Sequence, residues 1–132
     1  MDTLKQLFSD KEIELILEEC PYIKKHSPED IKRILNILSN QKCSNFVIRN
    51  IIGRNPEILL RSSVDLEDLI YKFKEYDIIK LDKIFDKYPE ILNKCAYHID
   101  TYFFIKKKEG ISIEEASKML EDHPSIIDMT IE

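Results

Sequence analysis

Apolar residues recur along the chain at spacings of three and four, which is the pattern of one buried face of an α-helix. The pattern is clearest ahead of four of the five prolines, where apolar residues stand eight, five and four positions before the proline. These prolines are almost evenly spaced, and an isoleucine follows each of them two positions later. They are Pro21, Pro56, Pro89 and Pro124. The recurrence predicts four similar helical units that stack, because a single unit cannot cover its own apolar face.

Each unit is predicted to begin with a capped helix that the proline ends. The residue twelve positions before each proline is of a type whose side-chain oxygen can bind the first free amides of a helix. These N-cap candidates are Ser9, Ser44, Asp77 and Ser112. Ser9 with Glu12, and Ser112 with Glu115, have the spacing of a capping box. The residue before a proline is disfavoured in the α region, so the helix should stop there.

A second helix is predicted in the first three units. Ser27 and Pro28 form a helix start in the first unit, with Pro at the first helical position. The apolar stripes that follow are Ile31, Ile34, Leu35 and Leu38 in the first unit, Leu66, Leu69, Ile70 and Phe73 in the second, and Ile99, Tyr102, Phe103 and Ile105 in the third. The third stripe ends in three lysines, Lys106 to Lys108, which suit the helix dipole, and Gly110 is a good left-handed cap.

The predicted fold is therefore all-α, a short right- or left-handed α-solenoid of about four helix–turn–helix repeats. It should form one helical-repeat domain over residues 1–132, with roughly seven α-helices and no sheet. The units are expected at about 7–41, 42–76, 77–109 and 110–132. The register places Ile51 and Ile84 in the core, and most of the aromatic residues fall on apolar stripes as well. The aromatic residues expected in the core are Phe46, Phe73, Phe85, Tyr102 and Phe103.

The fourth unit is expected to lack a second helix. Its apolar residues should then be poorly covered, because the ends of solenoids need a polar cap. They are Met119, Leu120, Ile126, Ile127 and Ile131. An uncovered end of this kind predicts self-association or a protein partner.

Composition indicates the class of protein and the compartment in which it is expected. The chain is 43% hydrophobic and 34% charged, has only two glycines and carries a net charge of −5, as expected of a folded helical protein with a charged surface. Three cysteines at irregular spacing predict no disulfide framework and fit a reducing compartment. The first residues lack the patterns of a secretory signal or a transit peptide, and no apolar run is long enough to span a membrane. A cytoplasmic protein is expected, or a mitochondrial one only if a transit peptide has been removed.

Catalytic chemistry finds little support in the sequence, and no enzyme, cofactor or metal site is predicted. Cys95 and His98 could share a metal ion, but a structural zinc site needs about four ligands and no second pair exists. His26, His98 and His123 lack the sequence context of a catalytic triad. Two glycines cannot build a phosphate-binding loop.

Basic residues do recur in register with the repeat in the middle of the chain. Arg54 and Lys87 stand two positions before their prolines, and Arg61 and Lys94 stand five positions after them. These four are the candidate nucleic-acid-binding residues, which Arg49, Lys24 and Lys25 extend. The competing interpretation is that they are ordinary solvated surface charges, since a helical protein this rich in charge has many of them.

The repeat resembles that of the mitochondrial transcription termination factor (mTERF) family. The resemblance is carried by residues 8–13 with 20–23, by residues 110–115 with 123–127, and most clearly by residues 55–60, Asn-Pro-Glu-Ile-Leu-Leu. It implies units of two α-helices and a short 3₁₀ turn in a curved superhelix. It also implies binding of nucleic acid through a basic groove, in organelle gene expression, with some members acting through partner proteins.

Two functions from different classes follow. The first is a non-enzymatic nucleic-acid-binding module that contacts phosphates of double-stranded DNA or RNA through the basic residues of units two and three. The alternative is a protein-interaction adaptor that uses the solenoid surface and the acidic fourth unit, in which Lys118 is the single basic residue.

Overall fold

The structure, a computed structural model, describes residues 2–131, and within that range it consists of α-helices and 3₁₀ helices with no strand. The α-helices are α1 (Asp2–Lys5), α2 (Asp10–Glu19), α3 (Pro28–Asn40), α4 (Asn45–Arg54), α5 (Ser63–Glu75), α6 (Leu81–Lys87), α7 (Ala96–Lys108), α8 (Ile113–Asp122) and α9 (Ile126–Ile131). The 3₁₀ helices are η1 (Pro21–Lys25), η2 (Pro56–Leu60) and η3 (Pro89–Asn93). The predicted all-α fold is confirmed, and the short helices α1 and α9 add to the seven that were expected.

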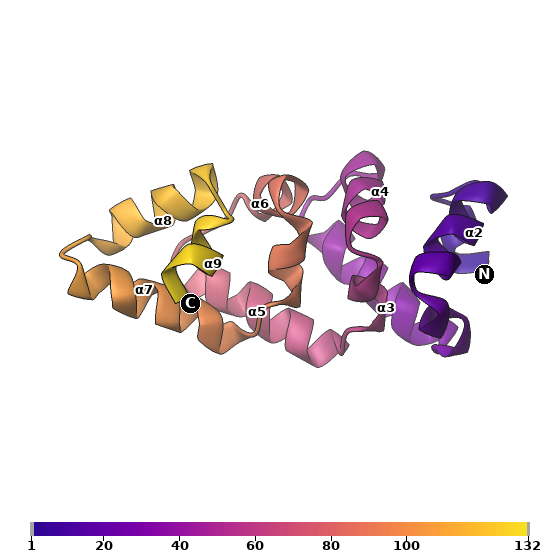
Figure 1. The fold of residues 1–132 in the computed structure, drawn as a ribbon, viewed down its shortest axis with the longest axis horizontal. Coiled ribbons are helices and arrows are strands. Elements are labelled where there is room, and N and C mark those ends of the chain that lie inside the picture. The colour runs from indigo at the N-terminus through magenta and orange to yellow at the C-terminus, as the bar shows by residue number, and fades with distance from the viewer. Residues whose placement is uncertain (1, 132) are drawn as a thin grey trace.

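The helices form two rows that run the length of the molecule (Figure 1). The first helices of the units, α2, α4, α6 and α8, lie along one edge, and the second helices, α3, α5 and α7, lie along the other. Contacts pass from each unit to the next within both rows, as between α4 and α6 and between α5 and α7. Each 3₁₀ helix joins the two rows of its own unit, and η2 also packs against α3 of the unit before it.

The prolines mark the change from the first helix to the 3₁₀ helix. Pro21, Pro56 and Pro89 are each the first residue of a 3₁₀ helix, where the missing backbone N–H leaves no hydrogen bond unmade. The residue before each proline lies outside the helical region, as the sequence predicts; Asn55, for example, has φ −145° and ψ 68°. The chain thus turns at the same place in each of the first three units.

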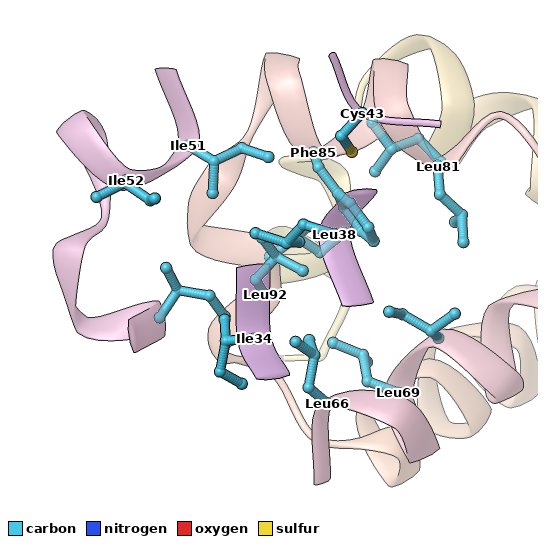
Figure 2. Packing of buried hydrophobic residues seen from close by; sticks show 14 of the residues in the cluster. Ile34, Leu38, Cys43, Ile51, Ile52, Leu66, Leu69, Leu81, Phe85 and Leu92 are labelled. Atoms are coloured by element: carbon cyan, nitrogen blue, oxygen red, sulfur yellow. The ribbon is translucent and has the colours of Figure 1, made fainter. Parts of the chain in front are cut away.

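The core is continuous along the molecule and follows the predicted register. Ile51 and Ile84, five positions before their prolines, are fully buried, and so are the isoleucines that follow Pro21, Pro56 and Pro89. Figure 2 shows side chains of three consecutive units meeting in one cluster. The labelled residues include Ile34 and Leu38 of α3, Ile51 and Ile52 of α4, Leu66 and Leu69 of α5, and Phe85 of α6. Each unit therefore completes the core of its neighbours.

The second helices end at three equivalent residues in the left-handed conformation, Lys42, Asp77 and Gly110, with φ of 65°, 60° and 82°. The turn after α5 is a Schellman motif, in which the Asp77 amide donates to the Lys74 carbonyl and the Ile78 amide to the Phe73 carbonyl. The prediction that Asp77 caps the next helix is therefore wrong. Asp77 ends α5, because Asp tolerates a positive φ better than most residues, and α6 begins only at Leu81.

The two glycines should respond oppositely to replacement by alanine. Gly110→Ala is expected to destabilise the protein by about 1 kcal/mol, because Gly110 holds a positive φ that a Cβ strains. Gly53→Ala should stabilise it by about 0.5 to 1 kcal/mol, because Gly53 lies inside α4 with open space around its Cβ position. Lys42→Gly, which relieves the same strain in unit one, should also stabilise. Urea unfolding measures all three, and a loss of stability in Lys42→Gly would contradict the left-handed assignment.

The fourth unit covers more of its apolar surface than the sequence suggested. Helix α9 stands where the other units have their 3₁₀ helix, and it folds back against α7. Leu120 and Ile127 are fully buried, and Ile126 and Ile131 pack against the core, while Met129 remains 79% exposed. The expectation of a poorly covered face is corrected, because the residues after Pro124 supply their own cover. This removes the main physical reason for self-association through the unit.

Three smaller expectations also change. Phe46, expected in the core, is 76% exposed on α4, because it lies outside the −8, −5, −4 stripe that faces the neighbouring units. Lys106, expected on the surface, is buried beside the Tyr102 ring and pairs with Glu109 at 3.1 Å. The capping box is complete at Ser9. At Ser112 the hydroxyl accepts a hydrogen bond from the Glu115 backbone amide, as a cap should. The Glu115 carboxylate accepts from the Ser112 hydroxyl and not from the Ser112 backbone N–H, so the box is incomplete.

Candidate nucleic-acid interface

The repeat-equivalent basic residues all stand where a first helix passes into its 3₁₀ helix or just beyond it. Arg54 and Lys87 end α4 and α6, Lys24 and Lys25 end η1, and the two residues that follow η2 and η3 are Arg61 and Lys94. The solenoid therefore presents one basic position per helix end, repeated from unit two to unit three. A regular row of cations suits the regularly spaced phosphates of a nucleic acid.

Arg54 and Lys87 make the same contact one unit apart. The Arg54 guanidinium donates to the Asp86 carbonyl at 3.4 Å, and the Lys87 ammonium donates to the Glu121 carbonyl at 3.4 Å. Both carbonyls stand three positions before the next proline, in the last turn of a helix, where backbone oxygens lack helical partners. Arg54 also lies 3.9 Å from the Glu90 carboxylate and keeps a side chain that is 48% exposed. Each cation is thus held by the following unit and still faces solvent.

Arg61 and Lys94 have a different role, because their charged ends are directed into the next unit. The Arg61 guanidinium donates to the Leu92 carbonyl. The Lys94 ammonium pairs with the Asp128 carboxylate at 2.5 Å, and both side chains are about three-quarters buried. These two basic residues join neighbouring units, which the sequence pattern alone did not distinguish from a solvent-facing pair.

The three remaining candidates divide in the same way. Arg49 pairs with the Glu12 carboxylate of unit one at 2.8 Å and lies over the Phe8 ring, so its charge is compensated. Lys24 and Lys25 are exposed, and within residues 2–131 neither makes an ion pair. Of the seven candidates, Arg54, Lys87, Lys24 and Lys25 therefore remain predicted ligand contacts with exposed side chains.

The family of the chain is shown by a match over nearly its whole sequence and not by these side chains. A sequence profile of the mTERF family matches residues 2–132. The chain belongs to the mTERF family. No curated protein and no solved structure matches it. The family assignment agrees with the α–3₁₀–α units seen in the structure of this mTERF protein.

Two further contacts between units of the mTERF chain were not predicted from the sequence. The residue before one proline contacts the residue four positions after the next. The Asn55 amide donates to the Asn93 side-chain oxygen at 3.0 Å and receives a bond from the Asn93 amide at 3.2 Å. At the equivalent places, the Tyr88 hydroxyl donates to the Asp128 carboxylate. In the sequence, both pairs have the same offsets from their prolines. One pair is Asn with Asn and the other is Tyr with Asp, so no recurring residue type marks the contact.

Cys95 and His98 lie together at the start of α7. The Cys95 amide donates to His98 Nδ1 at 2.9 Å, so this ring nitrogen helps to cap the helix. Burial, together with the positive charge of Lys94, lowers the pKa of His98, so the neutral ring that accepts this bond is favoured. Among the described residues no group of three potential metal ligands comes together. Nor does any helix within residues 2–131 have the length and apolarity that a membrane crossing requires.

Proposed function

We propose that this mTERF protein is a non-enzymatic module that binds the phosphate backbone of nucleic acid, in transcription or another step of gene expression. The observation that supports it is the pair Arg54 and Lys87, which make equivalent bonds to equivalent carbonyls and keep exposed charged ends. Membership of the mTERF family supports the same ligand class.

The anchoring of the two cations favours binding. A free arginine or lysine side chain loses rotamer entropy when it meets a phosphate, and a side chain already held by one hydrogen bond loses less. Arginine has five N–H donors and lysine has three, so a single bond to a carbonyl leaves donors for a phosphate. Units two and three therefore present two pre-positioned charges one repeat apart, with Lys24 and Lys25 of unit one beyond them.

Neutralising Arg54 and Lys87 should weaken nucleic-acid binding and its salt dependence together. With four phosphate contacts the logarithm of the association constant should fall with the logarithm of salt concentration with a slope of about −3 to −4 for duplex DNA. The Arg54→Gln, Lys87→Gln variant should lose roughly two units of this slope and about tenfold or more in affinity at low salt. Fluorescence anisotropy with labelled duplex DNA and with RNA measures both quantities. Arg61 and Lys94 stay unchanged, because they join units.

The matched control is Lys74→Gln with Lys107→Gln. These lysines are exposed and stand at equivalent positions in units two and three. They lie on the second helices, α5 and α7, and not near the prolines that end the first helices. The control variant removes the same charge at the same repeat spacing, so it should retain nearly the full salt slope. Equal binding by the two double variants would show that net charge and not this interface attracts the polymer. Absence of binding to both DNA and RNA at low salt would refute the proposal.

A further inference from the structure

A groove formed by residues of units one to three carries negative charge, in contrast to the basic candidate nucleic-acid interface. It has a volume of about 560 Å³ and is lined by side chains that include Glu19, Tyr22, Glu57, Leu60, Asp65 and Cys95. We call it the acidic groove. Arg61 also lines it, but the Arg61 guanidinium donates to the Leu92 carbonyl. The groove thus combines three carboxylates with one cation that is already engaged.

The three carboxylates are available to a ligand. Within residues 2–131, none of the carboxylates of Glu19, Glu57 and Asp65 makes an ion pair or a hydrogen bond. All three residues are exposed. Glu19 and Glu57 line the groove together with Cys20, and burial together with the charges of Glu57 and Glu19 raises the pKa of the Cys20 thiol. Three carboxylates that line one groove with a single cation, Arg61, leave a net negative charge that favours a positively charged ligand.

Part of the groove is apolar. Leu60 is only partly buried and packs on the core from the groove side. Tyr22 is 72% exposed at the start of η1, and an exposed aromatic ring beside a hollow is the usual kind of anchor point in a protein interface. A ligand that fits must therefore carry apolar groups as well as positive charge, which excludes a simple metal ion and the phosphate backbone.

We infer that the acidic groove binds a segment of a partner protein in which lysine or arginine alternates with apolar side chains. Charge complementarity selects the basic residues of the segment, and Tyr22 and Leu60 contact its apolar ones. The inference does not rest on nucleic-acid binding, because phosphates are repelled from this groove and attracted to Arg54 and Lys87. Two ligands of opposite charge would then bind different parts of the solenoid.

The first test uses a fluorescent peptide of alternating lysine and leucine, with a glutamate–leucine peptide for comparison. The lysine peptide should bind the wild-type chain, and the Glu19→Gln, Glu57→Gln, Asp65→Asn variant should bind it at least about tenfold more weakly. The control variant is Glu14→Gln, Glu67→Gln, Asp68→Asn, which removes three exposed carboxylates of α2 and α5 that do not line the groove. It should bind the peptide as the wild type does. Tyr22→Ala should lose affinity without any change of charge.

The second test locates the peptide through a thiol. Cys95 is exposed and lines the groove, whereas Cys20 and Cys43 are buried. Burial raises the pKa of the Cys43 thiol to about 12, so Cys43 stays unreactive. Bound lysine–leucine peptide should slow alkylation of Cys95 by iodoacetamide, as followed by mass spectrometry.

Several outcomes overturn the inference. They are absence of binding by the lysine–leucine peptide, equal binding by the glutamate–leucine peptide, equal loss in the groove and control variants, and unchanged alkylation of Cys95. The groove variant should keep its nucleic-acid binding, and the Arg54, Lys87 variant should keep its peptide binding. Failure of either function is therefore seen separately from failure of the other.

Discussion

Replacing Ile51 with aspartate is expected to destabilise the protein by about 3 to 5 kcal/mol, and the same change at Ile84 should do likewise. Both side chains are fully buried among apolar residues. An aspartate at either place must lose its hydration without a partner, and it also removes the packing of the isoleucine. Because each unit contacts mainly its neighbours, damage in unit two or three weakens the junctions on both sides. Urea unfolding followed by circular dichroism measures the effect.

Ile79 provides the control for this pair. It has the same side chain, follows α5 in the chain and is 75% exposed, so Ile79→Asp should change stability little. Unfolding of the Ile51→Asp and Ile84→Asp variants close to that of the wild type would show that the register of the repeat is wrong. A large effect of Ile79→Asp would instead show that the region between α5 and α6 packs differently.

The register was readable from the sequence because the prolines and the apolar residues follow the same period. Proline fixes one position of each unit, and Ile51 and Ile84 stand at the same distance from it. The second helices were equally clear, since their stripes keep helical spacing over three turns. Such patterns depend on local geometry alone, so they predict the core without knowledge of how the units are stacked.

The turns between units were harder to predict. Asp77 suits both the start of a helix and the left-handed end of one, and the sequence offers no local feature that separates the two. Helix α9 was missed for a different reason. It is only six residues long and packs against α7, a contact that only the folded chain supplies. Short elements of this kind are decided by tertiary contacts and not by local pattern.

The basic columns of the candidate site were found, but their roles were not. Sequence spacing shows that Arg54 and Arg61 recur in the next unit as lysines, yet it does not show in which direction a side chain points. The contacts across units separate the two columns, because Arg61 bonds to a carbonyl within the next unit and Arg54 keeps an exposed end. The only sign of the acidic groove in the sequence is a change of charge. Glu19 stands two positions before its proline, where Arg54 and Lys87 stand in the next two units. Its other carboxylates come from unrelated offsets and meet only through stacking.

This change of charge agrees with the proposal that different parts of the solenoid bind different ligands. Going along the chain, the position two residues before the proline is Glu19, Arg54, Lys87 and then Asp122. The sign of the charge therefore changes between units one and two and again between units three and four. A polyanion should therefore be kept away from the acidic fourth unit, and a basic protein segment should be limited to the acidic groove. The repeat supplies equivalent positions, and we propose that single substitutions within one column suit them to different ligands.

Removing the Asp128 carboxylate should open the junction between units three and four at neutral pH. Asp128 accepts bonds from the Tyr88 hydroxyl and the Lys94 ammonium, and both charged side chains are about three-quarters buried. Asp128→Asn is expected to cost about 2 kcal/mol, because it leaves a largely buried ammonium without a counter-charge. Tyr88→Phe should cost less, about 1 kcal/mol, since the ion pair remains.

The loss caused by Asp128→Asn should disappear in acid. Burial alone would raise the pKa of the Asp128 carboxyl, but the bonds from Lys94 and Tyr88 outweigh burial and hold the pKa below its usual range. A lowered carboxyl pKa contributes stability that is present above the unfolded value of about 4 and is lost as pH falls through the folded value. Wild type and variant should therefore differ fully at about pH 7 and converge towards about pH 3 in urea unfolding.

Asp100 is the control for this junction, because its carboxylate has the same kinds of partner in a more exposed place. It accepts from the Tyr76 hydroxyl at 2.7 Å and pairs with Lys72 at 3.3 Å, but it is 50% exposed. Solvent screens a pair of this kind, so Asp100→Asn should have a clearly smaller effect at neutral pH. Equal losses in the two variants, or a loss in Asp128→Asn that does not change between neutral and acid pH, would contradict the assignment of Asp128 as the charged link that holds the last unit in place.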